Sequence, residues 1–393
     1  CVAAGVAALA LRHLPGFAAR GAVCIALCGA LFAFANPPLQ TPDETEHYLR
    51  TYAISMGRLD FDAARGYPAD VTRLLDAFPG AWVNAHTSAG VGQDPDTGEE
   101  QPYNTAGYAL KQYGKDGAVQ SVADSFAQYL GGETPARDPV TEPVSFLILP
   151  FLPGALGMAL ARLAGLGALG CLYAGRLGNL AAYTLLCWLA LRSAQKAKPA
   201  FLCGMLLPIS LYMGASLSYD ATLLGCYYLM LALLTRPVWT ARTAWAYLAA
   251  CVFANGAKPY LNLLWAALPL LLPKRAWQPR RPRALWAGAC LALSLALTVF
   301  VEQYGVLMRH NYGVIARQGG EAVDGLGQLG FVLQNPLRYL AVLLGTLYEN
   351  DFFIGQLGLF GWKDLPIAFL NLTGPLVLAA AALLCTAPPD ALG

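Results

Sequence analysis

Residues 20–47 read RGAVCIALCGALFAFANPPLQTPDETEH, an apolar run that passes directly into a polar and acidic segment. The apolar part, 20–36, has the length of one membrane crossing, since roughly 20 apolar residues are needed to cross about 30 Å of hydrocarbon. Two consecutive prolines, Pro37 and Pro38, predict the end of this helix, because proline is poorly tolerated within one. The chain is therefore expected to leave a membrane here and to enter an acidic loop.

The composition of the whole chain is also that of a membrane protein. Hydrophobic residues make up 56% of the 393 residues and charged residues 13%, and the mean hydropathy is +0.46. A soluble domain would carry roughly 25% charged residues. The chain starts at Cys1 and stops soon after an apolar run, so we expect both ends to be truncated. We treat 1–393 as a single membrane domain of the all-α polytopic class.

Apolar runs predict about eight transmembrane helices. Besides 20–36, they lie near 174–192, 199–217, 219–235, 243–257, 259–273, 284–303 and 366–386. We divide 243–273 at Lys258-Pro259, because one helix of that length would exceed a bilayer at about 1.5 Å per residue. The division also places Arg242 and Lys274 on the same side. Two short helices are tolerated where their turn is buried in protein or lines a cavity.

The charges are separated along the chain, and this separation predicts its orientation. The segments placed inside contain no acidic residue, and their basic residues are Arg12, Arg20, Arg192, Lys196, Lys198, Arg236, Arg242, Lys274, Arg275, Arg280, Arg281 and Arg283. Sixteen of the 24 acidic residues lie in 37–143. Because Lys and Arg are enriched in cytoplasmic loops, we expect 37–143 to be a large first extracytoplasmic loop with interfacial helices. Residues 304–365 would form a second one, with an interfacial helix at 336–347.

The acidic segment after the first helix predicts a helix start with reactive side chains. Thr41 is expected as N-cap and Pro42 as the first helical residue, with acids in the first turn. On such a helix Asp43 and His47 are four residues apart and share one face. A carboxylate beside an imidazole at a membrane surface is suited to general base catalysis. The alternative is that Asp43 and Glu44 only cap the helix.

An apolar stretch and a polar pair follow the first loop. The apolar stretch 145–163 contains two prolines, and we interpret it as interfacial or re-entrant. Arg176 and Asn179 follow it at the outer end of the next span. Arg176 could bind a phosphate through two parallel hydrogen bonds, or its side chain could simply extend to the lipid headgroups.

Asp220 and Lys258 are the ionisable residues expected near membrane depth. Asp220 lies where two spans join with almost no loop, and Lys258-Pro259-Tyr260 forms the turn of the short helix pair. Such groups are costly in a membrane and usually face a cavity or a partner. They could pair with each other, which would be a structural role. Alternatively, Lys258 neutralises a lipid-linked phosphate while Asp220 orients the substrate.

The motifs occur in an order that resembles a known bacterial membrane family. They are Pro37-Pro-Leu-Gln-Thr-Pro-Asp-Glu-x-x-His47, Pro143 through Pro153-Gly-x-x-Gly157, Arg176-Leu-Gly-Asn179, Ser216-Leu-Ser-Tyr-Asp220, Lys258-Pro-Tyr260 and Gly358-Leu-Phe-Gly-Trp362. Together they resemble the family catalogued as domain-of-unknown-function family 2142, over about residues 30–370. The sequence Trp362-Lys363-Asp364 departs from the Trp-Leu-Asp expected for that family, which weakens any role for position 363.

The layout is also similar to the GT-C superfamily of polyprenyl-phosphate-dependent glycosyltransferases, which carry an acidic motif just after their first helix. This resemblance implies transfer of a sugar from a polyprenyl-phosphate donor to a cell-envelope glycan acceptor, at the outer face of the bacterial cytoplasmic membrane. The catalytic candidates are then Asp43, Glu44, Glu46 and His47, with Asp43 as the base. The donor phosphate would be bound by Lys258, Arg176 and Tyr260. The substrate would be oriented by Asp220 and Asn179. Some members use a divalent cation such as Mg²⁺ or Mn²⁺, for which Asp43, Glu44 and Asp220 are the oxygen ligands to consider.

Two other classes of function stay open from the sequence. A transporter for a lipid-linked sugar would need polar residues along a path through the bilayer, and few are present. A non-catalytic scaffold would bind a partner through 37–143 and would tolerate Asp43→Asn. No phosphate-binding loop, dinucleotide fingerprint or nucleophile elbow occurs, nor any Cys/His metal spacing. The expected partners are therefore the lipid bilayer, the donor and the acceptor, with no nucleic acid.

Overall fold

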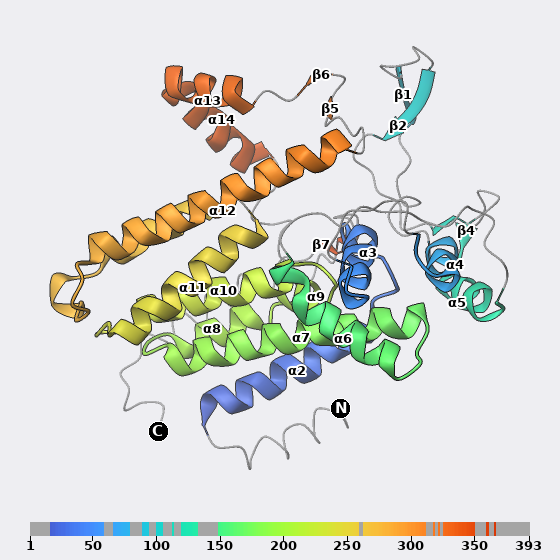
Figure 1. Ribbon diagram of the computed structural model, residues 1–393, viewed down its shortest axis with the longest axis horizontal. Helices are drawn as coiled ribbons and strands as arrows, with labels where there is room; N and C mark the ends of the chain where they lie inside the picture. Colours follow the sequence, from blue (N-terminus) through green and yellow to red (C-terminus); the bar gives the residue numbers. More distant parts are fainter. Residues whose placement is uncertain are drawn as a thin grey trace.

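The computed structural model is mainly helical over the residues that it describes (Figure 1). These are residues 16–58, 66–78, 89–93, 100–104, 112–113, 119–132, 148–258, 262–311, 317–318, 321–322, 325–349, 359–360 and 365–366. Strands occur there only as antiparallel pairs: β1 (Ala89–Gln93) with β2 (Glu100–Asn104), β3 (Gln112–Tyr113) with β4 (Val119–Gln120), β5 (Arg317–Gln318) with β6 (Glu321–Ala322), and β7 (Leu359–Phe360) with β8 (Leu365–Pro366). The helical class is thus confirmed, with short strand pairs added in the loops.

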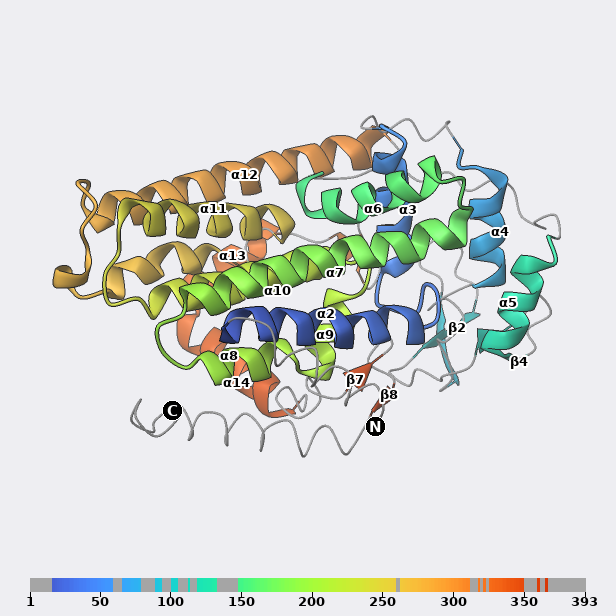
Figure 2. The same cartoon turned by 90° about the horizontal axis from the view of Figure 1, so that it is seen from below.

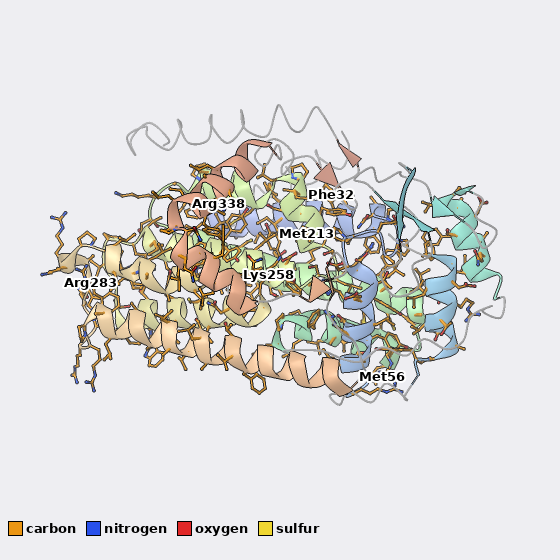
Figure 3. All side chains as sticks on the ribbon, turned by 90° about the horizontal axis from the view of Figure 1, so that it is seen from above. Phe32, Met56, Met213, Lys258, Arg283 and Arg338 are labelled. Carbon is orange, nitrogen blue, oxygen red and sulfur yellow. The ribbon has the colours of Figure 1, made fainter. Side chains whose placement is uncertain are left out.

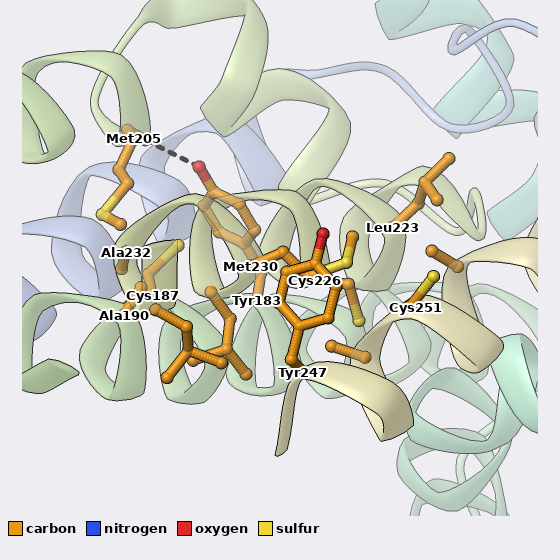
Figure 4. Close-up of a cluster of buried hydrophobic side chains, with 14 of the residues drawn as sticks. Tyr183, Cys187, Ala190, Met205, Leu223, Cys226, Met230, Ala232, Tyr247 and Cys251 are labelled. Atoms are coloured by element: carbon orange, nitrogen blue, oxygen red, sulfur yellow. Dashed lines mark hydrogen bonds between the residues drawn. The ribbon is translucent and has the colours of Figure 1, made fainter. Parts of the chain in front are cut away.

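A bundle of helices is arranged around α7 (Ala168–Ser193), as Figure 2 shows. Its other members are α2 (Phe17–Ala35), α8 (Lys198–Met205), α9 (Pro208–Gly214), α10 (Asp220–Leu234), α11 (Ala241–Ala257), the 3₁₀ helix η3 (Leu263–Leu271) and α12 (Arg283–Asn311). Within it, α7 packs against α2 and α10, α10 against α11, and α11 against α12. The core between them is apolar apart from groups such as the Tyr183 hydroxyl, which donates a hydrogen bond of 2.9 Å to the Met205 carbonyl (Figure 4).

Two helices of the described part are long and apolar enough to cross a bilayer: α2, and residues 283–300 of α12. They correspond to the predicted spans at 20–36 and 284–303. Shorter apolar helices cover Leu149–Leu163, Asp220–Leu234 and Pro336–Gly345. The predicted total of eight spans is therefore not confirmed, and the predicted span at 366–386 lies outside the described residues except for Pro366.

The predicted single span at 199–217 is wrong, because it is broken into α8 and α9. Helix α8 ends at Met205, and Leu207, the residue before Pro208, has an extended conformation with ψ of 137°. The ring of a proline disfavours the helical conformation for the residue before it. Pro208 then starts α9, a position that suits proline because its missing N–H would have no partner there.

The predicted division at Lys258 is confirmed. Helix α11 ends at Ala257, and the chain returns as η3, a 3₁₀ helix rather than the expected α-helix. Asn262 stabilises the turn, since its side-chain amide donates to the carbonyls of Ala254 (2.9 Å) and Lys258 (2.8 Å) at the end of α11. The Ala254 carbonyl also accepts from the Lys258 N–H at 3.0 Å, so the asparagine adds a second hydrogen bond there. At Lys258 it binds a carbonyl that lies beyond the last helical residue.

The apolar stretch predicted to be interfacial forms η2 (Leu149–Phe151) and α6 (Leu152–Leu163). Helix α6 packs against α7, whereas η2 contacts α3 and α11. Glycines allow α6 and α7 to approach closely. A Cβ atom on Gly157 would lie 2.2 Å from the Ala174 carbonyl oxygen, and one on Gly178 would lie 2.3 Å from that of Pro153. Small residues at such contacts are typical of membrane helices.

The described helices of the first loop form a second, smaller core on the N-terminal half of α7. They are α3 (Glu44–Ser55), α4 (Ala69–Ala77) and α5 (Val122–Leu130). This core includes Tyr48 and Leu74 together with Leu172 of α7. The Tyr48 hydroxyl donates to the Ala168 carbonyl (3.2 Å), and a carboxylate oxygen of Asp70 accepts from the Ala168 N–H (2.8 Å) at the start of α7.

The two ends of the bundle are formed by different elements. Helices α3, α4 and α5 gather at one end (Figure 2). Arg283 lies at the opposite end from Met56, the residue that follows α3, and Lys258 lies between them (Figure 3).

In the second loop, α13 (Gly325–Gln334) is followed by α14 (Pro336–Glu349), so a helix is present where 336–347 was predicted.

Candidate functional site

The acidic segment makes a turn before α3 begins, and the predicted cap is wrong. Thr41 is buried, and its hydroxyl accepts a hydrogen bond of 2.9 Å from the Asn36 side chain. Its carbonyl accepts from the Glu44 N–H at 3.0 Å, so Pro42 and Asp43 form the middle of a turn. Asp43 is the actual N-cap, with a left-handed φ of 56°. Proline followed by a residue with positive φ is a common turn pattern, and aspartate tolerates this conformation better than most side chains do.

Asp43 is exposed as a result, whereas Glu44 is buried in an ion pair with Arg176. Both side chains are inaccessible to solvent, and the closest oxygen–nitrogen distance is 2.6 Å. The second contact, from Arg176 Nε to Glu44 Oε1, is 2.9 Å. Charge-assisted hydrogen bonds of this kind are roughly twice as strong as neutral ones, and the two-point contact fixes the geometry.

The remaining N–H groups of Arg176 bind the end of the first helix and the residues after it. They donate to the carbonyls of Ala33 (2.9 Å), Asn36 (2.7 Å) and Pro37 (2.8 Å). An arginine has five N–H donors, and all five are used. In this arrangement Arg176 has no donor left for a phosphate, so its contacts support the fold.

Glu44 and Asn179 also fix the turn that leads into α10. The Glu44 carboxylate accepts from the Leu217 N–H at 3.2 Å. The Asn179 side chain donates to the carbonyls of Ser216 (2.9 Å) and Ser218 (3.1 Å). The Ser218 hydroxyl in turn accepts from the Asp220 N–H at 3.1 Å. Asn179 therefore holds the backbone that positions Tyr219 and Asp220.

His47 is buried between aromatic rings, with 5% of its surface exposed. Its ring centroid lies 5.0 Å from that of Tyr219 and 5.6 Å from that of Phe151. Burial, followed by the charges of Arg50 and Lys258, lowers the pKa of His47 to about 3. The imidazole is thus neutral at neutral pH, and its Nδ1 atom has no hydrogen-bond partner among the described residues.

Lys258 completes the cluster from the end of α11. Its ammonium lies 5.8 Å from the centroid of the Tyr219 ring. It interacts electrostatically with His47 and Asp220, and Asp220 interacts with Asp43 as well. Within the described residues, Lys258 and Asp220 do not form a direct ion pair. We call Asp43, His47, Tyr219, Asp220 and Lys258 the charged site.

The other predicted site residues have different surroundings. Glu46 is exposed and forms an ion pair of 3.3 Å with Arg50 on the same helix. Tyr260 lies outside the described residues. No group of three metal-ligating side chains comes together in the described part of the chain, and Glu44 is occupied by Arg176. The oxygen set of Asp43, Glu44 and Asp220 therefore does not fit a divalent cation as arranged.

Tyr219 and Phe151 were not predicted from the sequence to take part in the site. These two rings, with centroids 6.0 Å apart, enclose His47 and bring it next to the lysine. Tyr219 directly precedes Asp220, and Phe151 stands between two prolines, so each was adjacent to a feature already noted. Asn262 was missed as well, although it lies only four residues after Lys258.

A family model described as "Predicted membrane protein (DUF2142)" matches residues 26–387 of the chain. The resemblance stated from the ordered motifs is thereby confirmed. No curated protein and no solved structure matches. The similarity to GT-C glycosyltransferases stays a prediction.

Proposed function

Since the chain belongs to the DUF2142 family of predicted membrane proteins, we propose that it is a membrane glycosyltransferase. It would move a sugar from a polyprenyl-phosphate donor to a cell-envelope glycan acceptor. The observation that supports this best is the charged site. Its residues Asp43, Asp220 and Lys258 come from three distant parts of the chain and interact electrostatically in the fold. Ionisable groups that come together near membrane depth are more often functional than structural.

The proposal includes a multi-pass topology in the bacterial cytoplasmic membrane. The end with α3, α4 and α5 would face outward, and the end with Arg283 would face the cytoplasm. Enrichment of Lys and Arg in the cytoplasmic loops supports this orientation. A donor whose lipid lies in the outer leaflet would then present its phosphate at the depth of the charged site.

Asp43 is the proposed general base. It would remove the proton of an acceptor hydroxyl as that oxygen attacks the anomeric carbon of the sugar. The bond between this carbon and the donor phosphate oxygen breaks in the same step. The exposed position of Asp43 at the start of α3 leaves its carboxylate accessible, and the N-terminus of a helix favours a negative charge.

Lys258 is the proposed ligand of the departing phosphate, on which negative charge develops in the transition state. A preorganised ammonium in a site with little water is effective for this purpose. The donor brings its own leaving group, so no nucleotide is required. His47 would act as a neutral hydrogen-bonding group through Nδ1, and Asp220 would keep its predicted role of orienting the substrate.

Three predicted site residues take supporting roles in this proposal. Glu44 and Arg176 join the end of α2 to the start of α3 and to α7, and Asn179 holds the turn before Asp220. They would set the position of Asp43 relative to Asp220 without contacting the substrate. The proposal therefore leaves Arg176 out of the phosphate-binding residues.

Analysis of the envelope glycan in a deletion strain tests the proposal. The strain is complemented with the wild type or with Asp43→Asn, which keeps the shape of the side chain and removes its basicity. We expect the wild type to restore the glycan and Asp43→Asn to fail at equal protein level. Full restoration by Asp43→Asn would favour a scaffold or a lipid-linked sugar transporter instead.

A further inference from the structure

An apolar pocket of about 220 Å³ lies between η2, α11 and α12. Its lining includes Pro150 from η2, Val252 and Phe253 from α11, and Leu297 from α12, and none of its lining residues has a polar side chain. Apolar pockets of this kind select ligands by shape and by the absence of polar groups.

Two elements connect the pocket to the charged site. Gly256 lines the pocket, and Lys258 follows two residues later, at most about 7.6 Å away between Cα atoms. On the other wall, Pro150 lines the pocket while the next residue, Phe151, contacts both His47 and Tyr219. Lys258 and the apolar pocket are thus neighbours in the fold. This combination fits an amphiphile with an anionic head.

We infer that this pocket holds the first isoprene units of the polyprenyl-phosphate donor. The inference rests on the proposed function, and it adds where the lipid chain of the donor is bound. An apolar cavity of about 150 Å³ accommodates the six carbons of benzene. On that scale the pocket accommodates roughly nine carbons, which is a little less than two isoprene units.

The chemistry of the lining favours an isoprenoid over a phospholipid. In a polyprenyl phosphate, the carbon chain begins directly at the phosphate oxygen, so an apolar wall next to the ammonium is complementary to it. In a phospholipid, the glycerol and its esters would occupy the same place. Their oxygens would find no hydrogen-bond donor among the lining side chains, and unpartnered polar groups are costly in an apolar site.

Photo-crosslinking tests the inference without requiring turnover. The probe is a polyprenyl phosphate with a diazirine in its first isoprene unit, added to the full-length protein in vesicles of phosphatidylethanolamine and phosphatidylglycerol. We expect crosslinked peptides that contain 248–256 or 293–297, and we expect unlabelled polyprenyl phosphate to reduce the yield at least fivefold. Extra phosphatidylglycerol should not reduce it. Equal competition by phosphatidylglycerol would overturn the inference, because the pocket would then be an ordinary lipid site.

A matched pair of variants on α12 gives the control. Leu297→Trp fills the pocket and should lower the crosslinking yield at least fivefold, whereas Leu291→Trp, at an exposed position outside the pocket lining, should leave it unchanged. Equal yields from both variants would overturn the inference. If the probe crosslinks to the pocket but the protein shows no transferase activity, only the proposed function is contradicted. Transfer with crosslinks only elsewhere would contradict the pocket alone.

Discussion

Arg176 and Glu44 are 132 positions apart in the chain, and their side chains form a two-point ion pair with no exposed surface. The pair joins α7 to the start of α3, which carries Asp43 at its N-cap. Its closest contact, at 2.6 Å, is short even for a charged hydrogen bond. The ion pair therefore fixes the start of α3, and with it the proposed base Asp43, to α7 at the centre of the bundle.

Removing one partner of this pair should be strongly destabilising. Glu44→Gln leaves a buried guanidinium without its counter-charge, and such a change costs about 3–5 kcal/mol. Glu46→Gln is the matched control, because the Glu46–Arg50 pair is exposed at the glutamate and such pairs contribute about 1 kcal/mol or less. Thermal unfolding in detergent compares the two variants. A similar change in Tm for both would contradict the structural role of Glu44.

The close contact between α6 and α7 predicts a second stability effect. Gly157→Ala places a methyl group against the Ala174 carbonyl, so the helices must separate, at a cost of about 1–3 kcal/mol. Gly288→Ala on α12 meets no atom within 4 Å and should be neutral or slightly stabilising. Thermal unfolding of the two alanine variants checks this, and an equal loss of stability at both positions would contradict the packing described for α6.

Titration of His47 should make stability depend on pH. Its pKa is about 3 in the folded protein, compared with about 6.5 in an unfolded chain. The folded state therefore binds this proton less tightly. The contribution of His47 is complete above about pH 6.5 and is lost as the pH falls towards 3. The Tm of the wild type should fall more steeply between pH 7 and pH 5 than that of His47→Gln, and parallel profiles would contradict the buried neutral imidazole.

The proposed orientation can be measured on intact cells. A membrane-impermeant maleimide should label a cysteine introduced by Asp96→Cys in the first loop. It should not label Arg280→Cys until the cells are opened, because position 280 belongs to a basic loop. Strong labelling at 280 together with none at 96 would reverse the orientation and would remove the extracytoplasmic site from the account.

Much of this arrangement could be predicted because it follows from local rules. The prolines after the first apolar run, and the basic residues on both sides of 243–273, were enough to predict the end of α2 and the turn at Lys258. The spacing of Asp43 and His47 also predicted that the two residues belong to the same site. The break before Pro208 was missed because the span was predicted from apolar residues alone, without the restriction that a proline places on the conformation of the residue before it.

The pairing of Glu44 with Arg176 could not be predicted from spacing. Each residue looked equally suited to a substrate, and only the tertiary fold decides that they bind each other. The N-cap was wrong for a similar reason, since the hydroxyl of Thr41 is bound to Asn36 rather than to the helix that follows. The count of membrane spans stayed unconfirmed because several apolar helices are short or carry polar residues in the core, such as Asn179.

The most direct test of the account is the amount of polyprenyl-phosphate-linked sugar in lipid extracts of the complemented deletion strain, measured by mass spectrometry beside the glycan itself. A transferase that cannot activate its acceptor leaves its donor unused. Asp43→Asn should therefore abolish the glycan and raise the lipid-linked sugar several-fold over the wild type, while Glu46→Gln should resemble the wild type. A full-level glycan with Asp43→Asn and none with Glu46→Gln would assign the base to Glu46. Normal glycan and normal donor levels in both variants would contradict the glycosyltransferase itself.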